Sequence, residues 1–375
     1  MLVAGALVLL FAFGARSCGD DAPPMTAEQA RRLELDRNPV ELTLSFTGDL
    51  LIHSPVWGRA LALGGGARYD FAPLFAELDP YVSGADLAFC HVETPMTPDP
   101  PTSYPIFNTP PDLAKGIAQS GWDACDTASN HSLDQGEDGI GQTIKALDRA
   151  GVKHTGSATS QAEARRPLML KAGGIRIAYL AYTTDTNGIP VPKPWDVNIA
   201  DADRILEDSR RAKDAGAEAV IVNLHWASEV VGEYVTEPDG AQEKLVDRLA
   251  RAPEITAIVG QGPHVVQPIE KVAGKTVVFS EGNLVSNQGA DTGLPEASQD
   301  GYVALLDLVV DGDGARVEDA RYVPVWVDHV DYTVLPVGDA LDKGEGDASV
   351  LDASYKRTVA VAGREAATPE PEKLP

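Results

Sequence analysis

The segment Thr127-Ala128-Ser129-Asn130-His131-Ser132-Leu133-Asp134-Gln135-Gly136 places an amide, an imidazole and a carboxylate within five residues. A short apolar run at 122–126 precedes it, and apolar residues recur at helical spacing over 139–150. Asn130 and His131 are therefore predicted on a strand-to-helix loop, where α/β enzymes place their chemistry. Taken alone, the segment is equally consistent with Asn130 and Ser132 capping the helix and His131 being incidental.

Strand-like and helix-like segments alternate on both sides of this loop. Strands are predicted at 42–47, 85–91, 122–126, 175–182, 219–224, 255–259, 276–280 and 302–310. Helices are predicted at 110–120, 139–150, 200–215 and 240–252. This alternation indicates an α/β layered domain with much parallel sheet, whereas 302–327, interrupted by Asp311-Gly312-Asp313-Gly314, is typical of a β-hairpin.

The N-terminus has the features of an export signal. Residues 2–15 form an uncharged, mostly apolar run that is shorter than a membrane span and close to the core of a signal peptide. Cys18 follows it, as in bacterial lipoproteins whose cysteine is lipidated, although Ala15 replaces the usual Leu and no basic residue precedes the run. We predict a signal peptide or lipoprotein-type leader at 1–18. The protein is then exported, and is either anchored at the extracellular face of the membrane, by lipid or by its N-terminus, or secreted.

The remaining chain divides into three parts. Residues 19–39 are polar and are predicted to form a linker, with a short helix or tether. Residues 40–328 contain all the predicted strands and form one core domain. Residues 329–375 are acidic and rich in Gly and Ala, so we predict a disordered tail.

Composition limits the possible partners. The chain has 31 basic and 56 acidic side chains, a formal charge of −25, which opposes general nucleic-acid binding and provides no basic patch for anionic lipids. A polyanionic substrate would need help from a metal or an arginine. The hydrophobic content of 43% excludes wholesale disorder.

Two cysteines besides Cys18 lie on predicted strands that lead into polar loops. Cys90 and Cys125 could pair if their strands are neighbours, or they could be two small buried hydrophobic residues. We do not expect disulfides to hold the fold.

Polar side chains gather at the ends of the predicted strands. Five of the seven histidines lie there, namely His53, His91, His131, His225 and His264. Asp49, Glu93 and Asn130 have the same placement. Parallel strands present their carboxyl ends at one edge of a sheet, so these groups can converge. Asp, Glu, Asn and His suit Mn²⁺, Fe or Zn²⁺, and a site with two such ions activates water and neutralises phosphoryl charge.

The order and spacing of six motifs resemble a known family. The motifs are 46–49, 91–95, 129–136, His225-Trp226 with Glu229, 263–268 and 282–285. Over residues 42–327 the chain is similar to the capsule-synthesis CapA proteins (poly-γ-glutamate biosynthesis, PgsA-like), which have the calcineurin-like metallophosphoesterase fold. The resemblance implies a four-layer α/β/β/α sandwich of two mixed sheets flanked by helices.

The resemblance also implies roles for individual residues. It implies one or two divalent ions held by Asp49, Glu93, Asn130, His225 and His264, with Glu93 as the candidate bridge. His131 would donate a proton to a leaving group or stabilise charge in the transition state, and Asp134 would orient it.

Two departures from the family pattern affect the ligand set. The family usually has Asn where this chain has His91, and often has His where this chain has Gly262. The first change adds or alters a ligand, and the second removes one. His53 is a further candidate for the site, although packing explains it as well, whereas His154 and His329 are interpreted as structural.

Two classes of function follow. One is an exported metal-dependent hydrolase that acts on a phosphoester or on an amide-linked polymer such as poly-γ-glutamate. The other is a non-enzymatic accessory protein of polymer export with a binding or vestigial metal site. In both, the expected partners are an anionic polymer or phosphoester and membrane-bound proteins of polymer synthesis or export, and nucleic acid is not among them.

Overall fold

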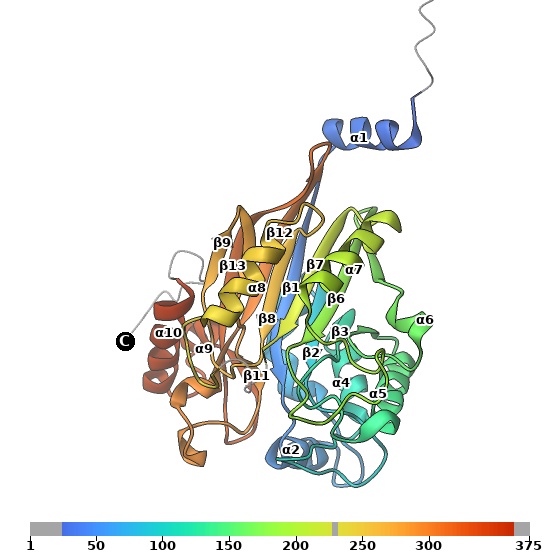
Figure 1. Cartoon of the computed structure of the whole chain (residues 1–375). Coiled ribbons are helices and arrows are strands. Elements are labelled where there is room, and N and C mark those ends of the chain that lie inside the picture. The colour runs from blue at the N-terminus through green and yellow to red at the C-terminus, as the bar shows by residue number, and fades with distance from the viewer. Residues whose placement is uncertain (1–24, 227–231, 364–375) are drawn as a thin grey trace, which may run out of the picture.

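Two mixed β-sheets form the centre of the molecule, with helices on their outer sides (Figure 1). The computed structural model describes residues 25–226 and 232–363. The predicted leader with Cys18, the motif residue Glu229 and the last twelve residues of the predicted tail, 364–375, lie outside these residues.

The first sheet has the path β14-β13-β12-β1-β2-β3-β4, and β11 pairs with β1. Strands β1, β2, β3 and β4 are parallel to one another, whereas β12 is antiparallel to β1. The strands are β1 (Val40–Leu50), β2 (Leu87–Val92), β3 (Ala124–Asp126), β4 (Lys153–Thr155), β11 (Asn283–Val285), β12 (Asp300–Asp311), β13 (Gly314–Val327) and β14 (Val334–Pro336).

The second sheet has the path β5-β6-β7-β8-β10-β9. Its four inner strands are parallel, and β5 and β9 are antiparallel to their neighbours at the two edges. The strands are β5 (Leu168–Ala172), β6 (Ile175–Thr183), β7 (Ala219–His225), β8 (Ala257–Gln261), β9 (Ile269–Val272) and β10 (Lys275–Val278).

Helices and short 3₁₀ segments complete the described chain. The helices are α1 (Ala27–Arg37), α2 (Ser54–Leu63), α3 (Asp79–Val82), α4 (Asp112–Gln119), α5 (Gly136–Ala150), α6 (Gln161–Ala164), α7 (Ala202–Asp214), α8 (Gly240–Ala250), α9 (Val337–Lys343) and α10 (Ala348–Ala362). The 3₁₀ segments are η1 (Ala72–Leu78), η2 (Ala290–Thr292) and η3 (Glu296–Gln299). Among the residues described, no helix is both long and apolar enough to span a membrane.

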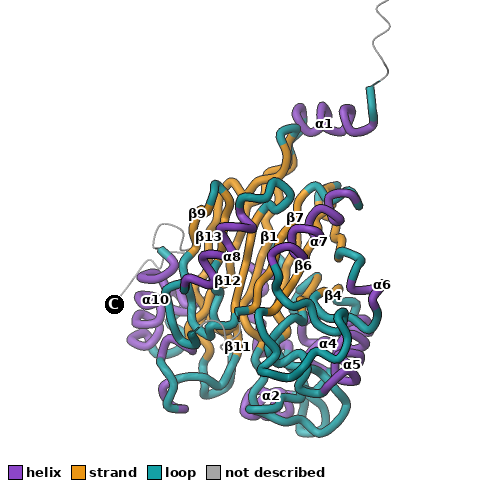
Figure 2. Tube along the Cα trace, viewed as in Figure 1, coloured by secondary structure: helices purple, strands orange, loops and turns teal. Residues whose placement is uncertain are grey.

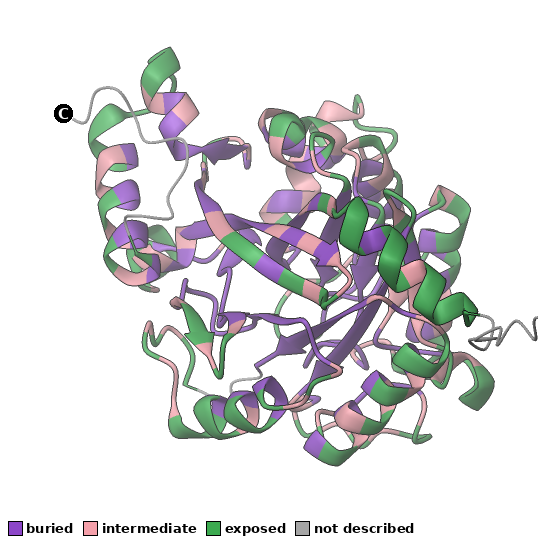
Figure 3. Ribbon diagram, turned by 90° about the horizontal axis from the view of Figure 1, so that it is seen from above, coloured by how far each residue is buried: buried purple, intermediate pink, exposed green. Residues whose placement is uncertain are grey.

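Three apolar clusters establish the order of the layers. One lies between the sheets, where Phe89 of β2 packs on Tyr179 of β6 with ring centroids 4.6 Å apart. The second includes Leu113 of α4 and Leu147 of α5 on the other face of the first sheet, and the third packs α7 and α8 on the second sheet. Buried residues fill the space between the sheets, and exposed residues cover the outer helices (Figure 3). The expected four-layer sandwich of two mixed sheets is confirmed.

Most elements of the predicted core domain agree with the structure. The predicted helix at 139–150 is α5, the predicted strand at 175–182 is β6, and the hairpin at 302–327 is β12 with β13. The short strands β4, β9 and β11 were not predicted. Loops gather at the end of the molecule where α2 and β11 lie (Figure 2).

The two ends of the described chain compare differently with the sequence predictions. The linker contains a short helix, one of the two predicted alternatives: α1 has a Thr26 capping box and buries Leu35 in the core between the sheets. The prediction of a disordered tail is wrong for 334–362, which form β14, α9 and α10. Leu351, Tyr355 and Val359 recur every four residues and bury one face of α10 in the core, a pattern that the acidic composition obscured.

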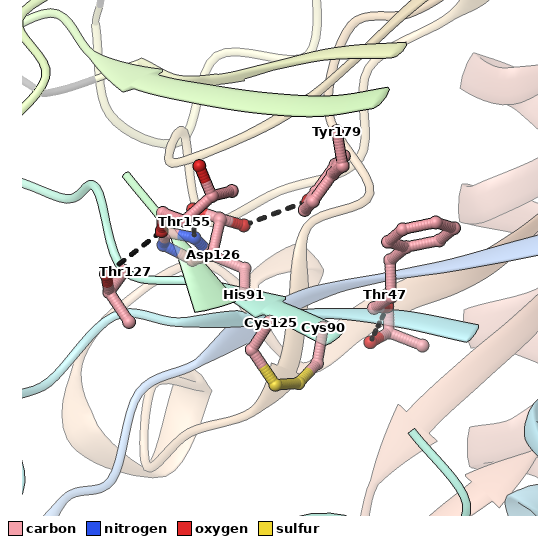
Figure 4. The surroundings of a disulfide bond; sticks show 9 residues. Thr47, Cys90, His91, Cys125, Asp126, Thr127, Thr155 and Tyr179 are labelled. Atoms are coloured by element: carbon pink, nitrogen blue, oxygen red, sulfur yellow. Dashed lines mark hydrogen bonds and ion pairs between the residues drawn. A yellow bond between two sulfur atoms is a disulfide. The ribbon is translucent and has the colours of Figure 1, made fainter. Parts of the chain in front are cut away.

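A disulfide joins Cys90 of β2 to Cys125 of β3 (Figure 4). The two residues are direct partners in the parallel pairing of these strands, and their Cα atoms are 4.4 Å apart. The pairing interpretation is therefore the one that the structure shows.

Candidate metal centre

Four of the five predicted ligands, together with His91, lie at the carboxyl ends of parallel strands from both sheets. Asp49 of β1 is the register partner of His91 in β2, and His225 ends β7. Glu93 follows β2 directly, and His264 lies in the loop just after β8. All five side chains are buried, with residue exposures between 0% and 4%.

Close backbone approach positions Asp49. The N–H of Asp49 donates to the carbonyl of Gly282 at 3.0 Å, and a Cβ at Gly48 would stand 1.9 Å from that carbonyl oxygen. Only glycine allows this approach. On the other side of Asp49, the N–H of Gly262 lies 3.3 Å from Oδ2 of the same carboxylate.

The side chains form two groups that could each hold an ion and that share Asp49. The first contains Asp49, His91 and His225, and the second contains Asp49, Glu93 and His264. In the first, Asp49 Oδ1 is 3.7 Å from His91 Nε2 and 3.8 Å from His225 Nδ1. In the second, Asp49 Oδ2 is 3.3 Å from His264 Nδ1, and Glu93 Oε1 is 3.8 Å from His264 Nε2.

Buried polar atoms without hydrogen-bond partners show that this donor set fits a cation. They are Asp49 Oδ1, His91 Nε2, His225 Nδ1 and both carboxylate oxygens of Glu93. Buried polar atoms are normally paired, because leaving them unpaired is costly. Oxygen and imidazole nitrogen are ligands that Mn²⁺, Fe and Zn²⁺ accept, so the centre is compatible with a divalent metal.

The electrostatics of the centre also favour a cation. Burial and the nearby Asp49 raise the pKa of Glu93. Burial would lower the pKa of His264, but Glu93 and Asp49 outweigh it and raise that pKa to about 10. Burial, together with His91 and His264, lowers the pKa of His225 well below its ordinary value. Two buried carboxylates thus repel each other and attract positive charge.

Asn130 and His131 lie beside these groups with different contacts. Asn130 Oδ1 is 3.0 Å from His225 Nε2, and its amide nitrogen donates to Asn187 Oδ1 at 3.2 Å. An amide oxygen has a second lone pair, which leaves it able to bind a metal. His131 Nδ1 is 2.8 Å from Asp134 Oδ2, and its ring meets the Phe107 ring edge-on with centroids 4.7 Å apart.

The structure places His53 outside both metal-binding groups. Its Nδ1 is 3.1 Å from the carbonyl oxygen of Leu51 and 3.2 Å from the N–H of Asn287. Its ring packs edge-on against Phe107, with centroids 5.2 Å apart. His53 therefore supports the loop beside His131.

Three residues that contact the centre were missed from the sequence. Asp126 accepts from His91, Asn283 Oδ1 is 3.0 Å from His264 Nδ1, and Tyr179 donates to Asp126. Asp126 is the last residue of β3, and Asp49 and His91 lie near the ends of their strands. The placement of a polar side chain at a strand end could therefore have identified Asp126. Tyr179 lies in the middle of β6 and gave no such signal.

Comparison with known proteins gives the chain its family. The model of the bacterial capsule synthesis protein PGA_cap matches residues 43–288. The capsule biosynthesis protein CapA of Bacillus anthracis is 26% identical over 73% of this chain and 68% of its own length. The PGA biosynthesis protein CapA of Bacillus subtilis is 27% identical over 66% of this chain and 64% of its own length. The chain thus spans about two thirds of these relatives.

Two solved structures illustrate how far the backbone of this chain resembles known proteins. The calcineurin-like phosphoesterase YfkN of Bacillus subtilis aligns with a TM-score of 0.43 and 15% identity over 86% of this chain and 97% of its own. The NAD nucleotidase of Haemophilus influenzae aligns with a TM-score of 0.47 and 11% identity over 88% of this chain and 57% of its own. Because the family model matches residues 43–288, the chain belongs to the bacterial capsule synthesis proteins of the PGA_cap family.

Proposed function

We propose that this chain is an exported metal-dependent hydrolase of poly-γ-glutamate-type capsule or envelope polymer synthesis or export. It cleaves a phosphoester or a γ-glutamyl amide. The observation that supports this most strongly is the set of unpaired buried carboxylate and imidazole atoms beside the His131–Asp134 pair. Family membership supports the polymer, since the relatives are described as capsule and PGA biosynthesis proteins.

Asp49, Glu93, Asn130, His225 and His264 hold the metal in this proposal. A bound divalent ion supplies Lewis acidity and an activated water. Asp134 accepts a hydrogen bond from Nδ1–H of His131, so the imidazole keeps one tautomer and Nε2 remains to exchange a proton with the substrate. Phe107 donates its N–H to the same Asp134 oxygen at 2.7 Å, which fixes the carboxylate.

The charge of the chain restricts how an anionic polymer is bound. A formal charge of −25 repels a polyanion at long range. The metal is therefore the main attraction for a carboxylate or phosphate group at this centre. The apolar run at 2–15 and Cys18 support export and anchoring, and membrane-bound polymer synthesis or export proteins are the proposed partners.

The test combines metal analysis of the purified protein with phosphodiesterase and γ-glutamyl hydrolase assays. We expect bound Mn, Fe or Zn and an activity that His131→Ala abolishes without changing metal content. His154→Ala is the matched control, because His154 lies on β4 outside both metal-binding groups. Absence of metal, together with unchanged activity in His131→Ala, would rule the hydrolase out.

A non-enzymatic accessory role is the second candidate, and the burial of the centre favours it. Asp49 and Glu93 are 0% and 1% exposed, which restricts access by a polymer. Two relatives from Mycobacterium tuberculosis are described as probable polyglutamine synthesis accessory proteins. Deleting the protein should then reduce envelope polymer, and a His131→Ala copy should restore it fully. Unchanged polymer after deletion contradicts both roles.

A further inference from the structure

His91 lies between two buried carboxylates, Asp126 and Asp49. Its Nδ1 is 2.7 Å from Asp126 Oδ1, and both residues are buried. The hydroxyl of Tyr179, from the second sheet, donates to the other oxygen of Asp126 at 3.1 Å. This chain of contacts sets the orientation of the imidazole ring.

These contacts also give the two ring nitrogens of His91 different roles. A carboxylate accepts hydrogen bonds, so Nδ1–H donates to Asp126, and Nε2 is the nitrogen that faces Asp49. Nε2 has no hydrogen-bond partner and is 3.7 Å from Asp49 Oδ1. That distance is too long for a hydrogen bond.

His225 directs its Nδ1 toward the same oxygen, Asp49 Oδ1. Its Nε2 is 3.0 Å from Asn130 Oδ1, which accepts a hydrogen bond from Nε2–H, and its Nδ1 has no hydrogen-bond partner. Nδ1 is 3.8 Å from Asp49 Oδ1. The His91 and His225 rings are nearly parallel, with centroids 4.7 Å apart.

Two imidazole nitrogens and a carboxylate oxygen, none of them with a hydrogen-bond partner, therefore face one another. Leaving three such atoms unpaired in a buried site is costly, and a cation between them would satisfy all three. Ligands about 2.1 Å from a tetrahedral Zn²⁺ are roughly 3.4 Å apart. The separations of 3.7 and 3.8 Å need only small movements to reach that geometry.

We infer that His91 is a metal ligand, which forms one metal position with Asp49 and His225, and that Asp126 and Tyr179 are its positioning residues. His91 is outside the five ligands that the resemblance implies, and it faces Oδ1 of Asp49, whereas His264 faces Oδ2. The inference rests on the proposed function, because it concerns the same centre.

Co²⁺ is the probe for this ligand. Its visible absorption reports coordination, and each coordinated imidazole with a retained ring N–H gives a hyperfine-shifted proton signal. The Nδ1 proton of His91 should give a slowly exchanging signal, because it is buried against Asp126. His91→Asn should remove that signal, change the absorption band and weaken Co²⁺ binding.

Asp126→Asn and Tyr179→Phe test the positioning roles. Asp126→Asn should weaken Co²⁺ binding by about 10- to 100-fold. Tyr179→Phe should keep the His91 signal but broaden it through faster proton exchange. His154→Asn is the matched control on the adjacent strand β4 and should leave spectrum and affinity unchanged. Circular dichroism of the metal-free variants separates lost binding from lost folding.

The outcomes distinguish this inference from the proposed function. If the unmodified protein binds Co²⁺ but a folded His91→Asn variant keeps the same signals and affinity, His91 is not a ligand and the proposed function stands. If the unmodified protein binds no Co²⁺, both are overturned. If His91→Asn does not fold, full Co²⁺ affinity and no change in any hyperfine-shifted imidazole signal in Asp126→Asn would contradict the inference, because the N–H that contacts Asp126 would then belong to no ligand.

Discussion

The carboxylate of Asp134 accepts from both His131 Nδ1, at 2.8 Å, and the backbone N–H of Phe107, at 2.7 Å, through one oxygen. Asp134 follows His131 by one turn, so the loop that carries the imidazole also carries the group that orients it. The Phe107 ring packs edge-on against the imidazole. His131 is thereby held in one rotamer and one tautomer beside the metal-binding groups.

Removing the imidazole of His131 should lower the catalytic rate and leave metal binding unchanged. His131→Ala is expected to lower kcat by roughly 10²- to 10⁴-fold, the usual contribution of a general acid. Metal content should not change, because His131 belongs to neither metal-binding group. Asp134→Asn should lower kcat less, since it disturbs only the tautomer and orientation. A loss of metal in His131→Ala would instead make His131 a ligand.

Removing the metal should destabilise the folded chain. Asp49 and Glu93 are buried together, and burial with Asp49 raises the pKa of Glu93, so charge repulsion opposes folding without a cation. Adding Mn²⁺ or Zn²⁺ at 100 times the Kd should stabilise the fold by about 2.7 kcal/mol and raise Tm by roughly 5 °C. Glu93→Gln should stabilise the metal-free protein and lose most of the metal response. An unchanged Tm on chelation would contradict a bound metal.

The sequence predicted the layered fold and the sheet edge where the metal ligands lie, because both follow from local patterns. Strand periodicity gave β1, β6 and β7, and strand ends identified Asp49, His225 and His264 as neighbours in space. The resemblance then placed the sheets face to face. Each of these steps uses residues near one another in the chain or one rule about parallel strands.

The remaining contacts depend on how the two sheets pack. Tyr179 is 53 residues from Asp126, and no periodicity indicates that its hydroxyl reaches that carboxylate. Helix α10 was missed because composition dominated the interpretation, although Leu351 and Val359 lie on one face. Short strands such as β11 are specified mainly by pairing, here with β1.

Gly262 shows why a histidine cannot simply be placed two residues before His264. Its φ of +110° is in the region that favours glycine, and a Cβ would stand 2.5 Å from the carbonyl oxygen of Trp226. Gly262→Ala should cost about 1–3 kcal/mol in backbone strain, and more from the clash. Gly274→Ala is the matched control, with a φ of +83° and open space around the new Cβ. Urea denaturation should show Gly262→Ala as the less stable variant, and equal losses would mean that the loop relaxes.

The C-terminal helix offers a test that is independent of the metal. Arg357 of α10 donates to both oxygens of Asp300, at 2.6 and 2.9 Å, and Ser354 donates to Oδ1 at 2.6 Å. Asp300 is fully buried at the start of β12. Arg357→Met leaves this carboxylate without its cation and should cost about 3 kcal/mol at neutral pH. Arg316→Met removes an exposed pair with Asp311 and should cost much less, because water and salt screen that pair.

The pH dependence of the stability lost in Arg357→Met tests whether the charge of Arg357 is responsible. Burial raises the pKa of Asp300 above its ordinary value even with Arg357 present, so ionisation of this carboxyl opposes folding. The stability that Asp300 contributes is complete at low pH and falls as the pH rises through the raised pKa. Without Arg357 that pKa rises further, so the deficit of Arg357→Met should be largest at neutral pH and shrink toward about pH 4. Thermal unfolding at several pH values measures it, and a deficit that does not change with pH would mean that Arg357 stabilises α10 through packing and not through its charge.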